Sequence, residues 1–230
     1  MKKILLVSAT KLPYEVTEPF SCFTKDTKLG PCLAIHEKVG NIDEVEIVTE
    51  NSNGLCEVYN RFFDKKWKDY IVVFVHDDVE IHSVDLKQRL NKAIEKYDIV
   101  GVAGSSSHSL KSPVLWHNSP REQWSGAVEH PVVEDGDTYS TNYFGEYPKQ
   151  VITLDGLFLA VNMEKALEHE LSFDEQFDFH FYDLDFSVSA STKGMKCGTW
   201  NIPTTHYSHG NYDNPSWREN EQKYIKKWKK

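Results

Sequence analysis

The chain has 230 residues, of which 40% are hydrophobic, and its 35 acidic and 26 basic side chains give a net charge of −9. An aromatic content of 13% excludes a disordered chain, and the acidic balance argues against a nucleic-acid-binding protein because it repels phosphate backbones. The sequence contains no run of about 18 apolar residues, so no transmembrane helix is predicted. The cysteines form no Cys-x-x-Cys pair, which favours reduced thiols in a cytosolic protein: Cys22, Cys32, Cys56 and Cys197.

The first half of the chain predicts alternating strands and helices. Its start resembles a signal peptide, but Ser8 and Thr10 cut the apolar run short, so a first strand over 4–7 is expected. Residues 10–30 show no period and predict a long loop. The order β-α-β-α-β-α-β predicts an α/β layer with a largely parallel sheet. The elements that follow the loop are a helix over 32–39 ended by Gly40, a strand over 45–49, a helix over 55–63 with Asn53 as N-cap, a strand over 70–75, a helix over 86–97 and a strand over 98–103.

The second half of the chain breaks this rhythm. Residues 104–150 are rich in Ser, Pro, Gly and Trp and predict a hairpin or an extended loop. An apolar segment over 151–161 follows, interrupted by Asp155 and Gly156, and a short helix is expected from Asn162 onward. A further helix is expected to stop at Gly194. The last predicted strand covers 197–202, and a basic, aromatic tail covers 217–230. With no linker apparent, one domain over 1–230 is expected.

His76, Asp77 and Asp78 follow the clearest buried strand. Ligands of parallel α/β sheets bind at the carboxyl ends of strands, and a divalent cation would offset the cost of clustering these side chains there. Carboxylate oxygens suit Mg²⁺ or Mn²⁺, and an imidazole shifts the preference toward Mn²⁺. The alternative is a polar loop that enters a helix, with Asp78 or Ser83 as its cap.

A second polar cluster lies among aromatic residues, and its members are Asp178, His180, Asp183 and Asp185. An aromatic environment excludes water and raises the pKa of a carboxylate toward that of a general base. The alternative is a helix start whose carboxylates favour the macrodipole. His206 and His209 follow the last predicted strand and could add a metal ligand. Dinucleotide, P-loop and hydrolase-elbow motifs are missing from the sequence, which leaves a metal-assisted transferase or a hydrolase of a phosphate ester.

These motifs together resemble the family-2-like glycosyltransferases of the GT-A fold, over about residues 46–217. The resemblance is carried, in order, by Asn53-Gly54, Tyr59-Asn60, Phe74-Val-His76-Asp-Asp78-Val, Leu154-Asp155-Gly156, Phe173-Asp174-Glu175, Phe179-His-Phe-Tyr-Asp183-Leu-Asp185 and His206-Tyr-Ser-His209-Gly210. It implies a three-layer α/β/α sandwich with a mostly parallel central sheet. It also implies transfer from a nucleotide-diphosphate-sugar donor to a glycan or lipid-linked acceptor in polysaccharide biosynthesis, with Mn²⁺ or Mg²⁺ and inversion of configuration.

The resemblance also implies roles for individual residues. The metal or diphosphate contact of the family falls on Asp78, with His76 and Asp77 beside it, and the distal histidine falls on His206 or His209. The catalytic base falls on Asp183, and Asp185 is the alternative because Tyr182 stands where the family has a glutamate. A sugar- or acceptor-facing carboxylate falls on Asp155, and Glu50 and Asn53 fall near nucleobase contacts. Four aromatic residues could stack on a sugar or pack in the core: Trp116, Trp124, Phe181 and Tyr182.

Three expectations concern the setting of the protein. The basic tail over 217–230 offers a peripheral contact with an inner membrane surface, and the alternative is plain solvation of a helix end. The expected location is cytoplasmic. A metal-dependent hydrolase, or an inactive sugar- or nucleotide-binding protein of the same fold, are the alternatives to a transferase.

Overall fold

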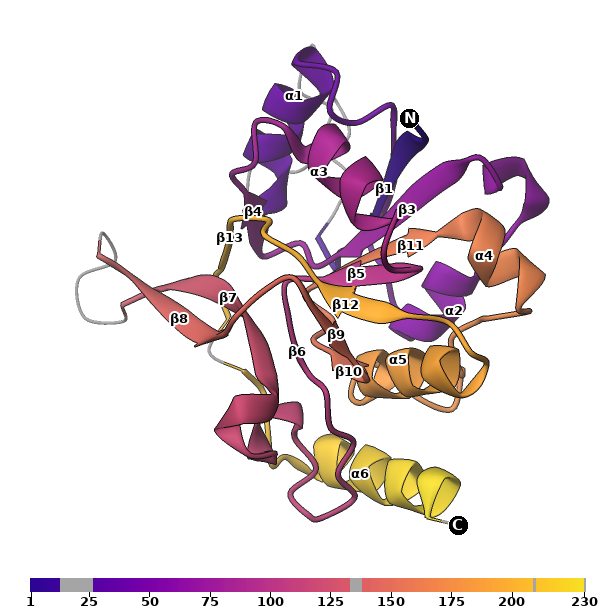
Figure 1. Cartoon of the computed structure of the whole chain (residues 1–230), viewed down its shortest axis with the longest axis vertical. Helices are drawn as coiled ribbons and strands as arrows, with labels where there is room; N and C mark the ends of the chain where they lie inside the picture. The colour runs from indigo at the N-terminus through magenta and orange to yellow at the C-terminus, as the bar shows by residue number, and fades with distance from the viewer. Residues whose placement is uncertain (13–26, 133–137, 209, 230) are drawn as a thin grey trace.

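The computed structural model of the chain describes residues 1–12, 27–132, 138–208 and 210–229. A seven-stranded sheet carries helices on both faces (Figure 1), and a six-stranded sheet continues from it where β5 runs on into β6. This arrangement confirms the expected three-layer α/β/α sandwich. Within the described part of the chain, no helix is both long enough and apolar enough to cross a membrane.

The larger sheet has the strand order β2-β1-β3-β11-β5-β12-β9. Strand β1 pairs parallel with β2 and β3, and β5 pairs parallel with β12. Because β11 is antiparallel to both β3 and β5, these two strands point the same way, so the sheet is mostly parallel as expected. Its strands are β1 (Lys3–Ala9), β2 (Glu44–Val48), β3 (Tyr70–Val75), β5 (Ile99–Gly101), β9 (Lys149–Val151), β11 (Phe158–Asn162) and β12 (Cys197–Thr199).

The strand residues divide between two cores, one on each face of the larger sheet. Leu5 and Phe74 belong to one core, and their neighbours Leu6 and Val73 belong to the other. Successive side chains of a strand point to opposite faces, so an uninterrupted apolar run such as β3 fits a strand that is covered on both sides. All six residues of β3 are buried.

Helices cover the two faces unequally. Helices α1 (Leu29–Lys38) and α3 (Leu86–Ala93) contribute buried residues to the core that contains Leu6. The opposite core receives buried residues from the other four helices, which are α2 (Leu55–Asn60), α4 (Met163–Glu168), α5 (Tyr182–Thr192) and α6 (Pro215–Trp228). The short 3₁₀ helices are Lys65–Trp67, Trp116–Asn118 and Arg121–Gln123.

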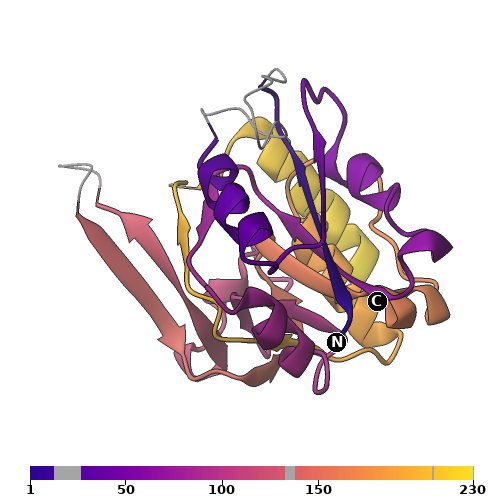
Figure 2. The ribbon, with the colours of Figure 1, turned by 90° about the horizontal axis from the view of Figure 1, so that it is seen from above.

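The smaller sheet carries the long hairpin, which confirms the prediction for residues 104–150. Strands β7 and β8 pair antiparallel and project from the rest of the fold (Figure 2). The sheet has the order β10-β6-β7-β13-β4, with β8 paired to β7. Its strands are β4 (Val79–Ile81), β6 (Ala103–Ser105), β7 (Trp124–Pro131), β8 (Tyr139–Gly145), β10 (Thr153–Leu154) and β13 (Thr204–His206).

Several local predictions were wrong. Gly54, not Asn53, is the N-cap of α2, and the Asn53 side-chain amide donates to Glu57. The expected strand over 98–103 divides into β5 and β6, since the chain passes from one sheet to the other there. The N-cap of α3 is Asp85, so neither Asp78 nor Ser83 caps a helix.

Other expectations fall partly outside the described residues. This applies to most of the long loop over 10–30 and to Cys22. The three described cysteines are free and buried, in agreement with the expectation of reduced thiols.

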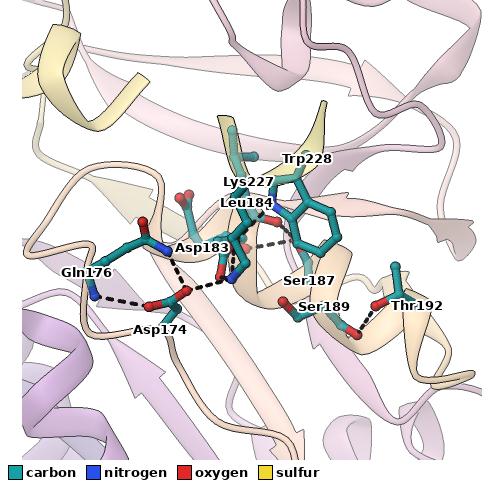
Figure 3. Close-up of polar contacts among 10 residues, drawn as sticks. Asp174, Gln176, Asp183, Leu184, Ser187, Ser189, Thr192, Lys227 and Trp228 are labelled. Atoms are coloured by element: carbon teal, nitrogen blue, oxygen red, sulfur yellow. Dashed lines mark hydrogen bonds and ion pairs between the residues drawn. The ribbon is translucent and has the colours of Figure 1, made fainter. Parts of the chain in front are cut away.

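The basic tail forms α6 and packs against the protein. Trp217 and Tyr224 are buried, and the Lys227 ammonium lies 2.7 Å from Asp174 and 2.8 Å from Asp185. Figure 3 shows the ammonium of Lys227 beside Asp174, with the indole of Trp228 next to it. Lys227 is thus paired with two carboxylates of the same chain.

Candidate active site

Three potential metal ligands meet at the carboxyl end of β3. His76 and Asp78 lie between β3 and β4, and His206 ends β13. Strand β13 pairs antiparallel with β4 and places His206 opposite Val79, which brings its imidazole beside Asp78. The Nε2 atom of His206 lies 3.3 Å from Asp78 Oδ1, and the Nδ1 atom of His76 lies 4.0 Å from the same oxygen. The potential ligand atoms of the three residues all lie within 4.8 Å of one another.

Two atoms of this cluster are buried without a hydrogen-bond partner among the described residues. They are Asp78 Oδ1 and His206 Nε2, which face each other as an ion pair at 3.3 Å but form no hydrogen bond. Buried polar atoms are nearly always paired, so orphaned atoms that converge on one point fit a ligand at that point. One carboxylate oxygen and two imidazole nitrogens suit a first-row divalent cation such as Mn²⁺ better than Mg²⁺, which prefers oxygen ligands. The residues present therefore fit the expected cation.

Asp78 and His206 stabilise each other's charged forms. Burial disfavours the carboxylate of Asp78, but the adjacent His206 and His76 lower its pKa below the usual value. Burial likewise disfavours the charged form of His206, and the Asp78 carboxylate outweighs this and raises the pKa of His206. Burial lowers the pKa of His76, which keeps that ring neutral. Only a neutral imidazole can bind a metal ion, so a cation bound here would displace the proton that Asp78 favours on His206.

Tyr182 fixes the orientation of His76. The Tyr182 hydroxyl donates to the carbonyl of Gly156 at 2.9 Å and lies 2.7 Å from His76 Nε2. Because its proton is engaged by the carbonyl, the hydroxyl oxygen accepts from Nε2, and the tautomer with a proton on Nε2 is favoured. Nδ1 then presents its lone pair toward Asp78. The ring of Tyr182 is only 3% exposed, so it holds His76 and offers little surface for stacking on a sugar.

We expect the substitution Tyr182→Phe to weaken metal binding. It removes the acceptor that fixes the His76 tautomer while keeping the aromatic ring in the core. Outer partners of ligating histidines typically contribute about 10–100-fold in metal affinity. Titration calorimetry with Mn²⁺ measures the change, and the melting temperature checks the fold. Unchanged Mn²⁺ affinity in the folded variant would show that Tyr182 does not orient a ligand.

Asp183 lies at the start of α5 and lines a cavity of about 160 Å³, which His76, Asp78 and His206 also line. Phe181, the residue before the helix, has a left-handed backbone with φ of 66°, and this turn directs Tyr182 and Asp183 inward. The Asp183 carboxylate accepts from the backbone N–H of Gly156 at 2.8 Å. A side chain at Gly156 would overlap the Tyr182 hydroxyl and come within 2.8 Å of Asp183 Cβ, so the close approach requires glycine there.

The electrostatic environment of Asp183 suits a general base. Burial, and next the charge of Asp155, raise its pKa from 3.8 to about 7. A base is most effective when its pKa lies near the working pH. Asp155 faces the same cavity and accepts from the indole N–H of Trp116 at 3.1 Å. Asp183 and Asp155 thus both lie near the metal-ligand cluster, and they accept from different donors, the Gly156 N–H and the Trp116 indole.

Asp185 occupies a different place. It is 1% exposed and accepts from Lys227 and from the indole N–H of Trp228 at 2.9 Å. It is absent from the described lining of the cavity that contains Asp183. Burial raises the pKa of Asp185, and Lys227 opposes that effect. Its position favours an anchoring role for Asp185.

The other predicted site residues are distributed around the cluster. Asn53 and Asp77 line a cleft of about 790 Å³ next to the cluster, together with Asp178 and His180. Glu50 is exposed and does not belong to the described lining of that cleft. His209 lies outside the described residues.

The aromatic side chains were only partly predicted. Trp124 lines a second cavity, which Asp155 and Trp116 share with the first. His117 and Tyr212 line both cavities and were not predicted. His117 lies in the short 3₁₀ helix Trp116–Asn118 and Tyr212 lies in a loop, and neither segment shows a period in the sequence, so only their aromatic character singles them out.

Comparisons with known proteins agree with this fold. Residues 22–228 match the family described as glycosyltransferase-like. The crystal structure of A197 from STIV has a TM-score of 0.51 at 15% identity, over 90% of this chain and 86% of that chain. The inositol-1-phosphate CTP transferase from T. maritima has a TM-score of 0.43 at 14% identity, over 99% and 97%. At identities this low, structural similarity shows the fold alone. The TM-score of the second structure is too low to support a conclusion about this chain. The search of curated proteins returned no match.

Proposed function

The chain belongs to the glycosyltransferase-like family, and on that premise we propose that it transfers a sugar from a nucleotide-diphosphate-sugar donor to an acceptor hydroxyl, with a divalent cation and inversion of configuration. The observation that carries the proposal is the cluster of His76, Asp78 and His206 beside Asp183. The reaction needs both a cation for the diphosphate and a base for the hydroxyl. We assign both to one domain over 1–230.

His76, Asp78 and His206 would hold the cation, with Mn²⁺ as the proposed ion and Mg²⁺ as the alternative. A cation held there would neutralise the negative charge that develops on the departing diphosphate. The cleft that contains Asn53 and Asp77 is the proposed place of the nucleoside. It adjoins the cluster through Phe179 and His180, which line both cavities. The donor would therefore lie with its diphosphate beside Asp78.

Asp183 would act as the base. Its carboxylate takes the proton of the acceptor hydroxyl while the oxygen attacks the anomeric carbon of the donor. One displacement of this kind inverts the configuration at that carbon. The Gly156 N–H holds the carboxylate in place, and burial, followed by the negative charge of Asp155, keeps its basicity high.

A pH profile follows from the pKa of Asp183. We expect kcat to rise with pH and to level off above pH 7, because the carboxyl must lose its proton to act and its pKa is about 7. Below that value, the rate should fall about tenfold for each pH unit. The measurement is kcat at saturating donor from pH 5 to pH 9, with the melting temperature recorded at each pH. A flat profile in the folded protein would contradict the assignment of the base.

The activity itself is tested with a panel of nucleotide sugars and Mn²⁺. The assay follows release of the nucleoside diphosphate, and mass spectrometry follows the sugar. Sugar joined to an acceptor supports the transferase. Free sugar alone, with acceptors present, supports the hydrolase. Donor binding without any product supports an inactive binding protein.

A further inference from the structure

A buried carboxylate of α6 binds the loop that leads into the candidate active site. Glu221 is 0% exposed, although it is an acidic residue on a surface helix. It accepts from the backbone N–H of Val114 at 2.7 Å and from the hydroxyl of Ser112 at 3.0 Å. Both donors belong to the segment between β6 and the 3₁₀ helix Trp116–Asn118, which reaches α6 (Figure 1). Glu221 therefore ties a loop without regular structure to the C-terminal helix.

The partners of Glu221 require a carboxylate. A third donor, Nη1 of Arg218, lies 3.0 Å from the same side chain. A carboxylate only accepts hydrogen bonds, so it can serve all three donors, whereas an amide would turn an N–H₂ group toward one of them. Burial of a carboxylate is unfavourable unless it is paired and hydrogen-bonded. The pairing is complete here, and two of the three bonds fix the same short stretch of loop.

The fixed stretch of loop determines where Trp116 lies. Val114 is 2% exposed, and Val114, Leu115 and Trp116 all line the cavity that contains the candidate base. The indole N–H of Trp116 donates to Asp155 Oδ2 at 3.1 Å, and the backbone N–H of Leu157 donates to Asp155 Oδ1 at 3.3 Å. One donor on each oxygen holds the plane of this carboxylate. Of the two donors, only the indole depends on the loop.

Asp155 in turn acts on Asp183. After burial, the charge of Asp155 is the largest contribution that raises the pKa of Asp183. Glu221 is absent from the described lining of the cavity that both aspartates share. Its effect on the site therefore passes through the loop and through Trp116.

We propose that Glu221 is a positioning residue, which holds the loop at Val114 and thereby places Trp116 against Asp155 beside the base Asp183. This role rests on the proposed function and adds a residue outside the cavity on which the geometry of the base depends. Glu221 touches neither substrate nor metal ion in this role.

The indole N–H signal of Trp116 in a proton–nitrogen correlation spectrum reports its bond to Asp155, and the loss of that signal in Trp116→Phe identifies it. Glu221→Gln keeps the size of the side chain and should displace the signal. Glu221→Met removes both acceptor oxygens and should displace it further. Arg218 also pairs with Asp213, so neither variant leaves the guanidinium without a carboxylate.

Glu219→Gln is the matched control. Glu219 is on the same helix and carries the same charge, but its side chain is 69% exposed and pairs with Lys223. Its variant should keep the wild-type position of the Trp116 signal and the wild-type kcat. The melting temperature of each variant checks that the spectra come from the folded protein.

Kinetics test whether the placement of Trp116 matters for the reaction. In Glu221→Gln, kcat should fall by roughly 10- to 100-fold, because small displacements beside the reacting groups have effects of that size. The dissociation constant of the donor and the affinity for Mn²⁺ should stay at their wild-type values, since Glu221 contacts neither site. Trp116→Phe should also lower kcat, and the double variant should be no slower than Trp116→Phe, because both changes remove the same contact.

Any of three results would overturn this role of Glu221. They are an unmoved Trp116 signal in both Glu221 variants, a wild-type kcat in a variant that displaces the signal, and losses of kcat that add in the double variant. Failure of the proposed function is a different result, namely a wild type that transfers no sugar from any donor. In that case the Trp116 signal still decides, without any assay of activity, whether Glu221 positions the indole.

Discussion

Replacement of Asp183 by Asn should abolish transfer while donor binding is retained. The amide keeps the size of the side chain and can still accept from the Gly156 N–H, but it cannot take a proton. General-base assistance typically contributes about 10²–10⁴-fold, so kcat should fall by that factor. The measurements are kcat at saturating donor and acceptor, and the donor dissociation constant by calorimetry.

Stability distinguishes loss of the base from loss of the fold. The folded state raises the pKa of Asp183 to about 7, so its favourable contribution is complete below the unfolded pKa of about 3.9 and is lost as the pH rises through 7. Asp183→Asn removes this loss, and the variant should melt above the wild type at pH 8. Asp185→Asn is the matched control and should keep measurable transfer. Wild-type turnover in the Asp183 variant would move the base elsewhere.

Asp78→Ala should abolish metal-dependent donor binding. Asp78 Oδ1 is the oxygen toward which both histidines converge, and its removal leaves two imidazoles without a carboxylate. Mn²⁺ affinity should fall by more than roughly 100-fold, since even outer partners of a metal ligand contribute up to that much. Calorimetry with Mn²⁺ alone, and then with a nucleoside diphosphate and Mn²⁺, measures both consequences.

Asp77→Ala is the matched control for this substitution. Asp77 is adjacent in sequence and carries the same charge, but it lines the neighbouring cleft and is not part of the metal-ligand cluster. Its variant should bind Mn²⁺ alone as the wild type does. Equal losses of Mn²⁺ affinity in the two variants would indicate a general effect of negative charge. An unchanged Mn²⁺ affinity in Asp78→Ala would show that Asp78 does not hold the cation.

The sheet could be predicted from the sequence because a buried strand is a continuous run of apolar residues. The run over 70–75 is apolar without interruption, and its end at His76 marks the edge where parallel strands place ligands. No sequence pattern predicted that His206 lies beside Asp78. It depends on pairing between two three-residue strands, β13 and β4, which are too short to show a period.

The choice between Asp183 and Asp185 depended on helix geometry. Residues two apart on an α-helix are rotated by about 200°, so both side chains cannot face one site. The start of α5 at Tyr182 then directs Asp183 to the cavity and Asp185 to Lys227. That start depends on the left-handed backbone of Phe181, a bulky residue that rarely adopts it, and no sequence rule predicts this.

The hydrogen bond between Tyr182 and His76 could not be predicted from the sequence either, because the two residues are 106 positions apart. The folded chain shows the Tyr182 hydroxyl in contact with His76 of the metal-ligand cluster.

Thermal unfolding of the wild type against a panel of nucleoside diphosphates and nucleotide sugars, with and without Mn²⁺, measures whether the protein binds a donor through a metal ion. A ligand at about 100 times its dissociation constant adds ~2.7 kcal/mol to the free energy of unfolding. For a chain of this size, this raises the melting temperature by roughly 5–10 °C. We expect such a rise for one nucleotide class in the presence of Mn²⁺, and we expect Asp78→Ala to lose it. No rise with any donor, or a rise that is independent of Mn²⁺ and of Asp78, would contradict this expectation.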